Sequence, residues 1–223
     1  MKTPLLRLVS IAAFSALVTS CAAGPGTEEA SGPRALPTTS TGDRELELPP
    51  AGFGTLRQDN VTVPLRWGDL LIKTTPLDES VTRLTAPDTH QRLSGLASTH
   101  RAALERQAFK NDLSLFLVSV FSYEANIPFV PEDLQLMSQG IRFRPLAVQP
   151  VTPGWDRRRL NQQETQMAIY AFDTGIELDV DLVVEYQATR SANWDAIIPV
   201  LQAERSKVRA RAPADTAGVT PGG

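Results

Sequence analysis

The chain has 223 residues, with 22 basic and 25 acidic side chains and a formal net charge of −3. A mildly acidic chain lacks the dense positive charge with which proteins neutralise phosphate backbones, which argues against nucleic-acid binding. Cys21 is the only cysteine. A disulfide within the chain is therefore excluded, and the folded part must depend on its hydrophobic core.

The first twenty residues have the pattern of a secretory signal. Lys2 and Arg7 give a positive start, and the apolar run 8–18 that follows is shorter than the roughly 20 residues of a membrane span. This run ends in Val18-Thr19-Ser20-Cys21, an aliphatic residue, two small residues and a cysteine. The tetrapeptide resembles the lipobox of bacterial lipoprotein precursors.

The resemblance implies a diacylglycerol thioether on Cys21, cleavage between Ser20 and Cys21, and acylation of the new amino terminus with a fatty acid such as palmitate. Several acyl chains hold a protein on a bilayer durably, at about 0.8 kcal/mol per buried methylene. Ala22, in place of an aspartate at that position, implies the periplasmic face of the outer membrane if the cell has one. An ordinary signal peptide with a chance cysteine and an uncleaved N-terminal helix are the alternatives.

Composition then divides the rest of the chain. Residues 21–50 are rich in Gly, Pro, Ser and Thr and have no apolar period, which predicts a disordered tether with a reach of about 30 Å. The lipobox resemblance implies that this segment begins with a lipidated N-terminus at Cys21. The tail 212–223 has a similar composition. We therefore expect a signal peptide over 1–20 and a single globular β-rich domain over 51–211.

Alternating apolar residues predict most of the elements of this domain. The expected strands cover residues 61–67, 70–77, 112–122, 134–138, 141–149, 165–173 and 176–186. Pro64 places the first of them at a sheet edge. Gln139-Gly140 predicts a tight hairpin, and Pro145 predicts a bulge or an edge in its second arm.

Two of these strands have distinctive patterns. The strand 112–122 is apolar on both faces, with Leu113, Leu115 and Leu117 on one and Phe116 and Val118 on the other, so it needs cover on both sides. The strand 176–186 alternates cleanly. Its inward residues are expected to be Leu178, Val180, Leu182, Val184 and Tyr186, with Glu177, Asp179, Asp181 and Glu185 facing solvent.

Two helices are expected. The first covers about Thr89–Phe109 and is opened by Pro87-Asp88, with Gln91 placed as in a capping box. Its apolar stripe consists of Leu93, Leu96, Ala97, His100, Leu104 and Ala108, and it is a candidate cover for the strand 112–122. The second starts near Ser191, and Pro199 should kink or restart it.

Many short strands without strand–helix–strand alternation indicate a mainly β fold. The prediction is an antiparallel β-sandwich, immunoglobulin-like in architecture only, with one inserted helix and a C-terminal helix. An α+β fold, with helices on one face of an antiparallel sheet, is the alternative.

Residues suited to catalysis or metal binding are sparse. His90 and His100 lie about 15 Å apart along the first helix, too far to share a metal or a proton. We interpret His90 as a solvated residue of the first helical turn and His100 as a hydrogen-bonded core or boundary residue. The acids Asp173, Glu177, Asp179 and Asp181 lack the spacing of a calcium loop. The run Arg157–Arg159 beside Trp155 is interpreted as a solvated loop rather than a headgroup site.

No catalytic residue, metal site or cofactor is therefore predicted, and the ligand-binding residues are unknown. The leading hypothesis is a lipid-anchored cell-envelope protein whose β-rich domain binds another protein or an envelope polymer and has no catalytic activity. One alternative is a carrier of a lipid or small apolar ligand, with a cavity bounded by Leu93, His100, Phe116 and Val118. A less favoured one is a hydrolase with two carboxylates roughly 5–10 Å apart.

Overall fold

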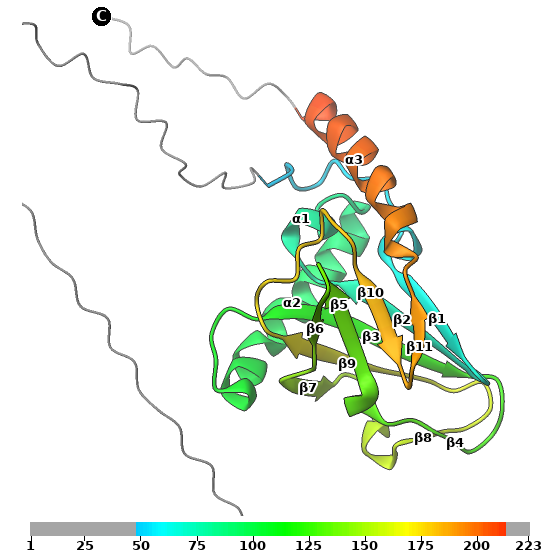
Figure 1. The fold of residues 1–223 in the computed structure, drawn as a ribbon. Coiled ribbons are helices and arrows are strands. Elements are labelled where there is room, and N and C mark those ends of the chain that lie inside the picture. The colour runs from blue at the N-terminus through cyan, green and yellow to red at the C-terminus, as the bar shows by residue number, and fades with distance from the viewer. Residues whose placement is uncertain (1–47, 213–223) are drawn as a thin grey trace, which may run out of the picture. The chain divides into compact units, whose positions relative to one another are not determined.

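The computed structural model describes residues 48–212, which form many short strands and three helices (Figure 1). The strands are β1 (Val63–Trp67), β2 (Leu70–Pro76), β3 (Ser114–Ser122), β4 (Ile127–Pro128), β5 (Leu134–Ser138), β6 (Ile141–Phe143), β7 (Ala147–Pro150), β8 (Arg159–Leu160), β9 (Thr165–Phe172), β10 (Val183–Tyr186) and β11 (Thr189–Ser191). The helices are α1 (Glu79–Thr82), α2 (Pro87–Ala108) and α3 (Trp194–Arg211), and single 3-10 turns cover Gln58–Val61, Pro131–Asp133 and Trp155–Arg157.

The strands form two principal antiparallel sheets. One has five strands in the order β1-β2-β3-β9-β7, and the other has four in the order β11-β10-β5-β6, while β4 and β8 make a separate pair. Side chains from both principal sheets share one buried cluster, which α3 also joins. Its largest fully buried side chains are those of Trp194, Tyr170, Tyr186, Phe116 and Phe172. The predicted antiparallel β-sandwich with an inserted and a C-terminal helix is confirmed.

β3 is buried on both faces, as its sequence predicts. Phe116, Val118 and Val120 belong to the cluster between the sheets. Leu115 and Leu117 belong to a second cluster on the opposite face, to which α2 contributes Leu93, Ala97 and Leu104. In Figure 1, α2 lies at the left of the sheets. The inserted helix therefore supplies the cover that β3 requires.

The start of α2 differs from the predicted capping box. Ala86 is the N-cap residue and makes no side-chain cap, Pro87 is the first helical residue, and Asp88 lies within the first turn. Proline fits this position because the first helical N–H groups have no partner inside the helix. The helix ends at Ala108, and its C-cap residue Phe109 has a left-handed φ of 52° and is 97% exposed.

The hairpin at Gln139-Gly140 is confirmed, but its second arm is not a single bulged strand. Both turn residues have positive φ, 51° and 75°, and Ser138 pairs with Ile141 across the turn. Beyond Phe143 the chain leaves the four-stranded sheet, and from Ala147 it pairs with β9 in the five-stranded sheet. Pro145 lies in this crossover because it cannot donate to either ladder.

The strand predicted over 176–186 is mostly wrong, since only Val183–Tyr186 is β-structure. β10 pairs with β5, and Val183 lies opposite Met137. β5 ends one residue later at the hairpin turn, so residues before Val183 have no strand to pair with. The Asp181 carboxylate instead accepts the Gln139 backbone N–H at 3.2 Å. Glu185, expected in solvent, is buried between Arg142 and Arg190.

The remaining predictions concern the sheet edge and α3. β1, which contains Pro64, is an edge strand of its sheet as predicted. α3 is one continuous helix that includes Pro199, so the predicted restart is wrong. At the beginning of the domain, the backbone at Gly54 lies close to the segment after α1. A Cβ on Gly54 would lie 2.3 Å from the Leu84 carbonyl carbon. Only glycine fits there.

Candidate binding groove

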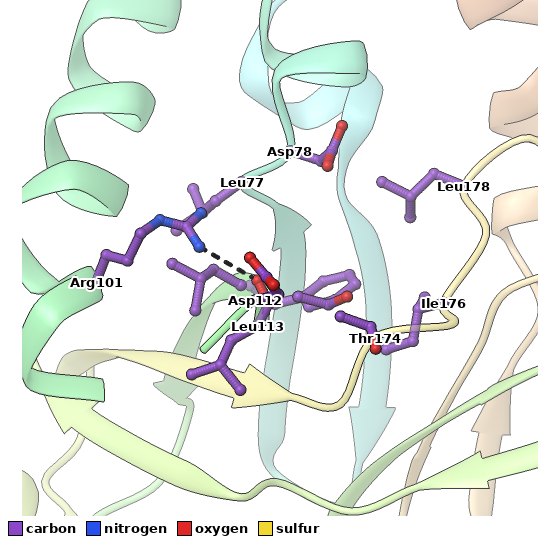
Figure 2. Close-up of a pocket in the computed structure, with 11 residues that line it drawn as sticks. Leu77, Asp78, Arg101, Asp112, Leu113, Thr174, Ile176 and Leu178 are labelled. Carbon is purple, nitrogen blue, oxygen red and sulfur yellow. Dashed lines mark hydrogen bonds between the residues drawn. The ribbon is translucent and has the colours of Figure 1, made fainter. Parts of the chain in front are cut away.

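Three adjoining hollows follow the loop 173–179, and we call them together the loop groove. The first is a cavity of about 290 Å³, shown in Figure 2. The second contains Asp173, Thr174 and Gly175 in its wall, and the third contains Ile176 to Asp179. Since the first cavity shares Thr174 with the second and Ile176 and Leu178 with the third, the three form a continuous surface.

The first cavity lies where β3 begins. Residues of four elements line it: Leu77 and Asp78 after β2, Arg101 of α2, Asp112 to Phe116 at the start of β3, and Thr174, Ile176 and Leu178 of the loop. In Figure 2, Arg101 reaches in from α2, and Ile176 and Leu178 lie on the opposite side. The cavity is therefore lined by both apolar and charged side chains.

The charged side chains of this cavity make different local contacts. The Arg101 guanidinium lies 3.5 Å from the Leu113 carbonyl oxygen and 3.9 Å from the Glu105 carboxylate. Asp78 is the N-cap of α1, where its Oδ1 accepts the Ser80 N–H at 2.8 Å. Asp112, in a left-handed conformation with φ of 56°, also lines the cavity. The side chains of Asp78 and Asp112 thus both line this cavity, which is one of the two conditions of the hydrolase hypothesis, the other being their separation.

α3 holds the loop in its irregular path. The Trp194 indole N–H donates to the Leu178 carbonyl oxygen at 3.1 Å, and Arg205 binds the Asp179 carboxylate at 3.0 Å. Lys110, just after α2, pairs with Asp173 at the other end of the loop. The loop is therefore fixed to both helices without belonging to a sheet.

The second hollow is the most apolar surface of the groove. Phe143 and Gly175 line it, together with Ile141 and Leu146, whose residues are 59% and 44% exposed. Half-exposed large apolar residues around a hollow mark sites at which proteins bind partners. The exposed arginines Arg142 and Arg144 border this hollow.

The acids considered for calcium binding do not converge. Asp173, Asp179 and Asp181 each contact a different group, namely Lys110, Arg205 and the Gln139 N–H. Over residues 48–212, no three His, Cys, Asp or Glu side chains lie close enough to hold a metal ion.

The two histidines also have separate environments. His90, expected in solvent, is mostly buried and its Nε2 lies 3.1 Å from Glu79 Oε2. Arg83 Nε and Ser94 Oγ donate to the same carboxylate at 2.7 and 2.6 Å. Burial alone would raise the Glu79 pKa, but these hydrogen bonds lower it to about 2. Ser94 binds the carboxylate rather than the imidazole, so this cluster joins α1 to α2 without forming a nucleophile–base pair.

His100 is half-buried at the edge of the α2 stripe, as its predicted boundary position requires. Its ring makes no hydrogen bond with the part of the chain that the structure describes. The arginine run is exposed but engaged. Arg157 pairs with Glu164, Arg158 with Glu132, and Arg159 with Asn126, while Trp155 is buried. Carboxylates therefore pair with Arg157 and Arg158, whereas Arg159 is bound by the neutral Asn126 and keeps its charge.

The structure does not describe the predicted lipidation residue, but it does describe the residues expected to bound a carrier cavity. Cys21 and the predicted cleavage site lie outside the described residues. The same holds for the predicted tether up to residue 47 and for the predicted tail beyond residue 212. Leu93 belongs to the cluster under α2, whereas Phe116 and Val118 face the opposite side of the same sheet. These residues therefore cannot bound one common cavity.

Sequence reasoning missed the loop groove. The predicted helix includes Arg101, and the predicted strand 141–149 includes Ile141 and Leu146. Most of the loop falls within the predicted strand 176–186. One signal was present, since the apolar alternation changes phase at Pro145, where the chain crosses between sheets and exposes Leu146.

Comparisons with known proteins identify no relative. No protein-family model matches the chain, and neither curated proteins nor solved structures show significant similarity to it. Among the helices of residues 48–212, none is long and apolar enough to cross a membrane.

Proposed function

We propose that this protein is a lipid-anchored cell-envelope protein whose β-rich domain binds a partner protein or an envelope polymer through the loop groove. The observation that supports it best is the continuity of three hollows along one loop, beside the half-exposed Ile141 and Leu146. Contiguous exposed apolar surface beside a hollow is a mark of protein–protein and ligand-binding sites.

The anchor is proposed from the sequence 18–21, Val-Thr-Ser-Cys, at the end of the apolar run. Acyl chains on Cys21 and on the new amino terminus would hold the domain at the membrane surface, on the periplasmic face of the outer membrane where one exists. Cys21→Ala should release the protein from the membrane fraction or leave it unprocessed. Unchanged membrane association that still requires detergent would refute the anchor.

Site-directed photo-cross-linking in the source cells tests the binding surface. A photoreactive residue at Thr174, which lines two of the hollows, should give a reproducible adduct with one partner. The matched control places the same residue at Gln202, an exposed position of α3. Equal adducts at both positions, or none at Thr174, would refute binding through the loop groove.

A carrier of a small apolar ligand is the second candidate, because Leu77, Leu115 and Phe116 contribute to the lining of the first cavity. Mass spectrometry of the protein isolated under mild conditions tests it. A stoichiometric small molecule that is lost on Leu115→Trp, a change that fills the cavity, would favour the carrier over the interaction domain.

A further inference from the structure

Two sheet edges meet beside the second hollow of the loop groove. β6 is the last strand of the four-stranded sheet and β7 the last of the five-stranded sheet, and residues 144–146 join them. Within residues 48–212, each of these strands pairs on one side only. The outer edge of β6 therefore presents backbone N–H and C=O groups without a neighbouring strand.

The face of β6 directed toward the core is apolar. Ile141 and Phe143 share this face because side chains alternate along a strand. Phe143 is buried in the cluster between the sheets, whereas Ile141 remains 59% exposed, and Leu146 adds a second half-exposed apolar side chain nearby. A strand placed beside β6 would cover these side chains with its own apolar residues.

The other face of β6 is positively charged. Arg142 and Arg190 both bind the buried Glu185 carboxylate, at 3.2 and 2.6 Å. One carboxylate neutralises only one of two guanidinium groups. Arg144, the residue after β6, is exposed and forms no ion pair within residues 48–212. An acidic side chain on this face would therefore meet uncompensated positive charge.

We infer that the outer edge of β6 binds an extended segment of a partner protein in which apolar and acidic residues alternate. The apolar side chains cover Ile141 and Leu146, the acidic ones lie beside Arg142 and Arg144, and the backbone pairs with β6 as an added strand. An acyl chain would leave the backbone groups and the arginines unused. The inference rests on the proposed function and specifies the chemistry of its partner.

Peptide binding to the full chain, isolated in detergent, tests this inference. The probe is the fluorescent peptide Glu-Val-Glu-Ile-Glu, and its control is Lys-Val-Lys-Ile-Lys, which has the same apolar residues and the opposite charge. We expect the acidic peptide to bind at least about tenfold more tightly by fluorescence anisotropy, and its advantage to shrink as salt is raised.

Variants of the protein locate the site. Arg144→Glu should weaken binding of the acidic peptide about tenfold, and Leu146→Asp should weaken both peptides. Arg209→Glu makes the same charge change at an exposed position of α3 and should have no effect. Both sites of substitution at the groove are exposed, and thermal unfolding followed by circular dichroism confirms that each variant folds.

Three outcomes overturn the inference. One is equal binding of the two peptides, and another is undiminished binding by Arg144→Glu and Leu146→Asp. The third concerns residues 45–48 of this chain, Glu-Leu-Glu-Leu, which alternate in the same way. A cross-link from position 146 to that segment, in the same or a second copy, would show that residues 45–48 occupy the edge of β6 in place of a partner protein. A partner captured at Thr174 without peptide binding at β6 would refute this inference and leave the proposed function standing.

Discussion

Two regions of the molecule, the face of the five-stranded sheet that α2 covers and the loop groove, differ in how completely they are filled. Under α2, the side chains of Leu93, Leu104 and Leu117 are essentially inaccessible to solvent. Around the loop 173–179, in contrast, the surface is hollowed and Leu146 is 44% exposed. Both regions are apolar, so composition does not separate them. What separates them is whether a regular element of matching length lies opposite.

Replacing one leucine by alanine in each region should reveal this difference most strongly. Leu104→Ala under α2 should lower the free energy of unfolding by about 2–5 kcal/mol, because it leaves a cavity in a packed cluster. Leu146→Ala in the groove makes the same chemical change and should cost less than about 1 kcal/mol. Urea unfolding of both variants measures the contrast. Equal costs would mean that the groove is as tightly packed as the helix-covered face.

The tie between α3 and the loop should give an intermediate effect. Trp194→Phe removes the indole N–H that binds the Leu178 carbonyl oxygen and should cost about 1–2 kcal/mol. Amide hydrogen exchange over residues 175–182 should accelerate more than exchange in β3 does. Equal acceleration in both segments would show that the loop is not a separately held unit.

The smallest expected effect concerns pH on the α2 side. The Glu79 pKa is lowered from 4.5 to about 2 in the folded protein, so its hydrogen bonds stabilise the fold above pH 4.5. This stabilisation is lost as the pH falls from about 4.5 toward 2. Since the side chain is 38% exposed, solvent screening reduces the effect to about 1 kcal/mol.

Glu79→Gln removes this titration and is its control. The variant should be less stable than the parent at neutral pH and should lose less stability on acidification between pH 4.5 and 2. Parallel pH profiles of the two proteins, measured by thermal unfolding, would contradict the assignment of the shift to Glu79.

The sequence predicts the fold well where two elements that pack together both have a periodic apolar pattern. β3 is apolar on both faces, and α2 has a stripe of the right length to cover one of them. Gly140 tolerates the positive φ that the second position of a tight turn requires, which makes the hairpin local and predictable. These features require no knowledge of distant contacts.

The candidate site depends on distant contacts and was not predicted. Leu178, Val180 and Leu182 alternate like a strand, but β5 ends at the hairpin and leaves them nothing to pair with. The length of β5 relative to β10 is a tertiary property. His90 was misjudged for the same reason, because its partner Glu79 lies eleven residues away on another helix.

The attachment of the domain's first residues to α3 has a mechanical consequence. Arg211 donates to the Phe53 carbonyl oxygen, and the Glu204 carboxylate accepts the N–H and the hydroxyl of Thr55. Just beyond, Leu56 exchanges backbone hydrogen bonds with residues 84 and 86. A pull on the N-terminal segment therefore meets this clamp before it reaches β1. The end of α3 bears the load first, and the sheets that position the loop groove are shielded from tension.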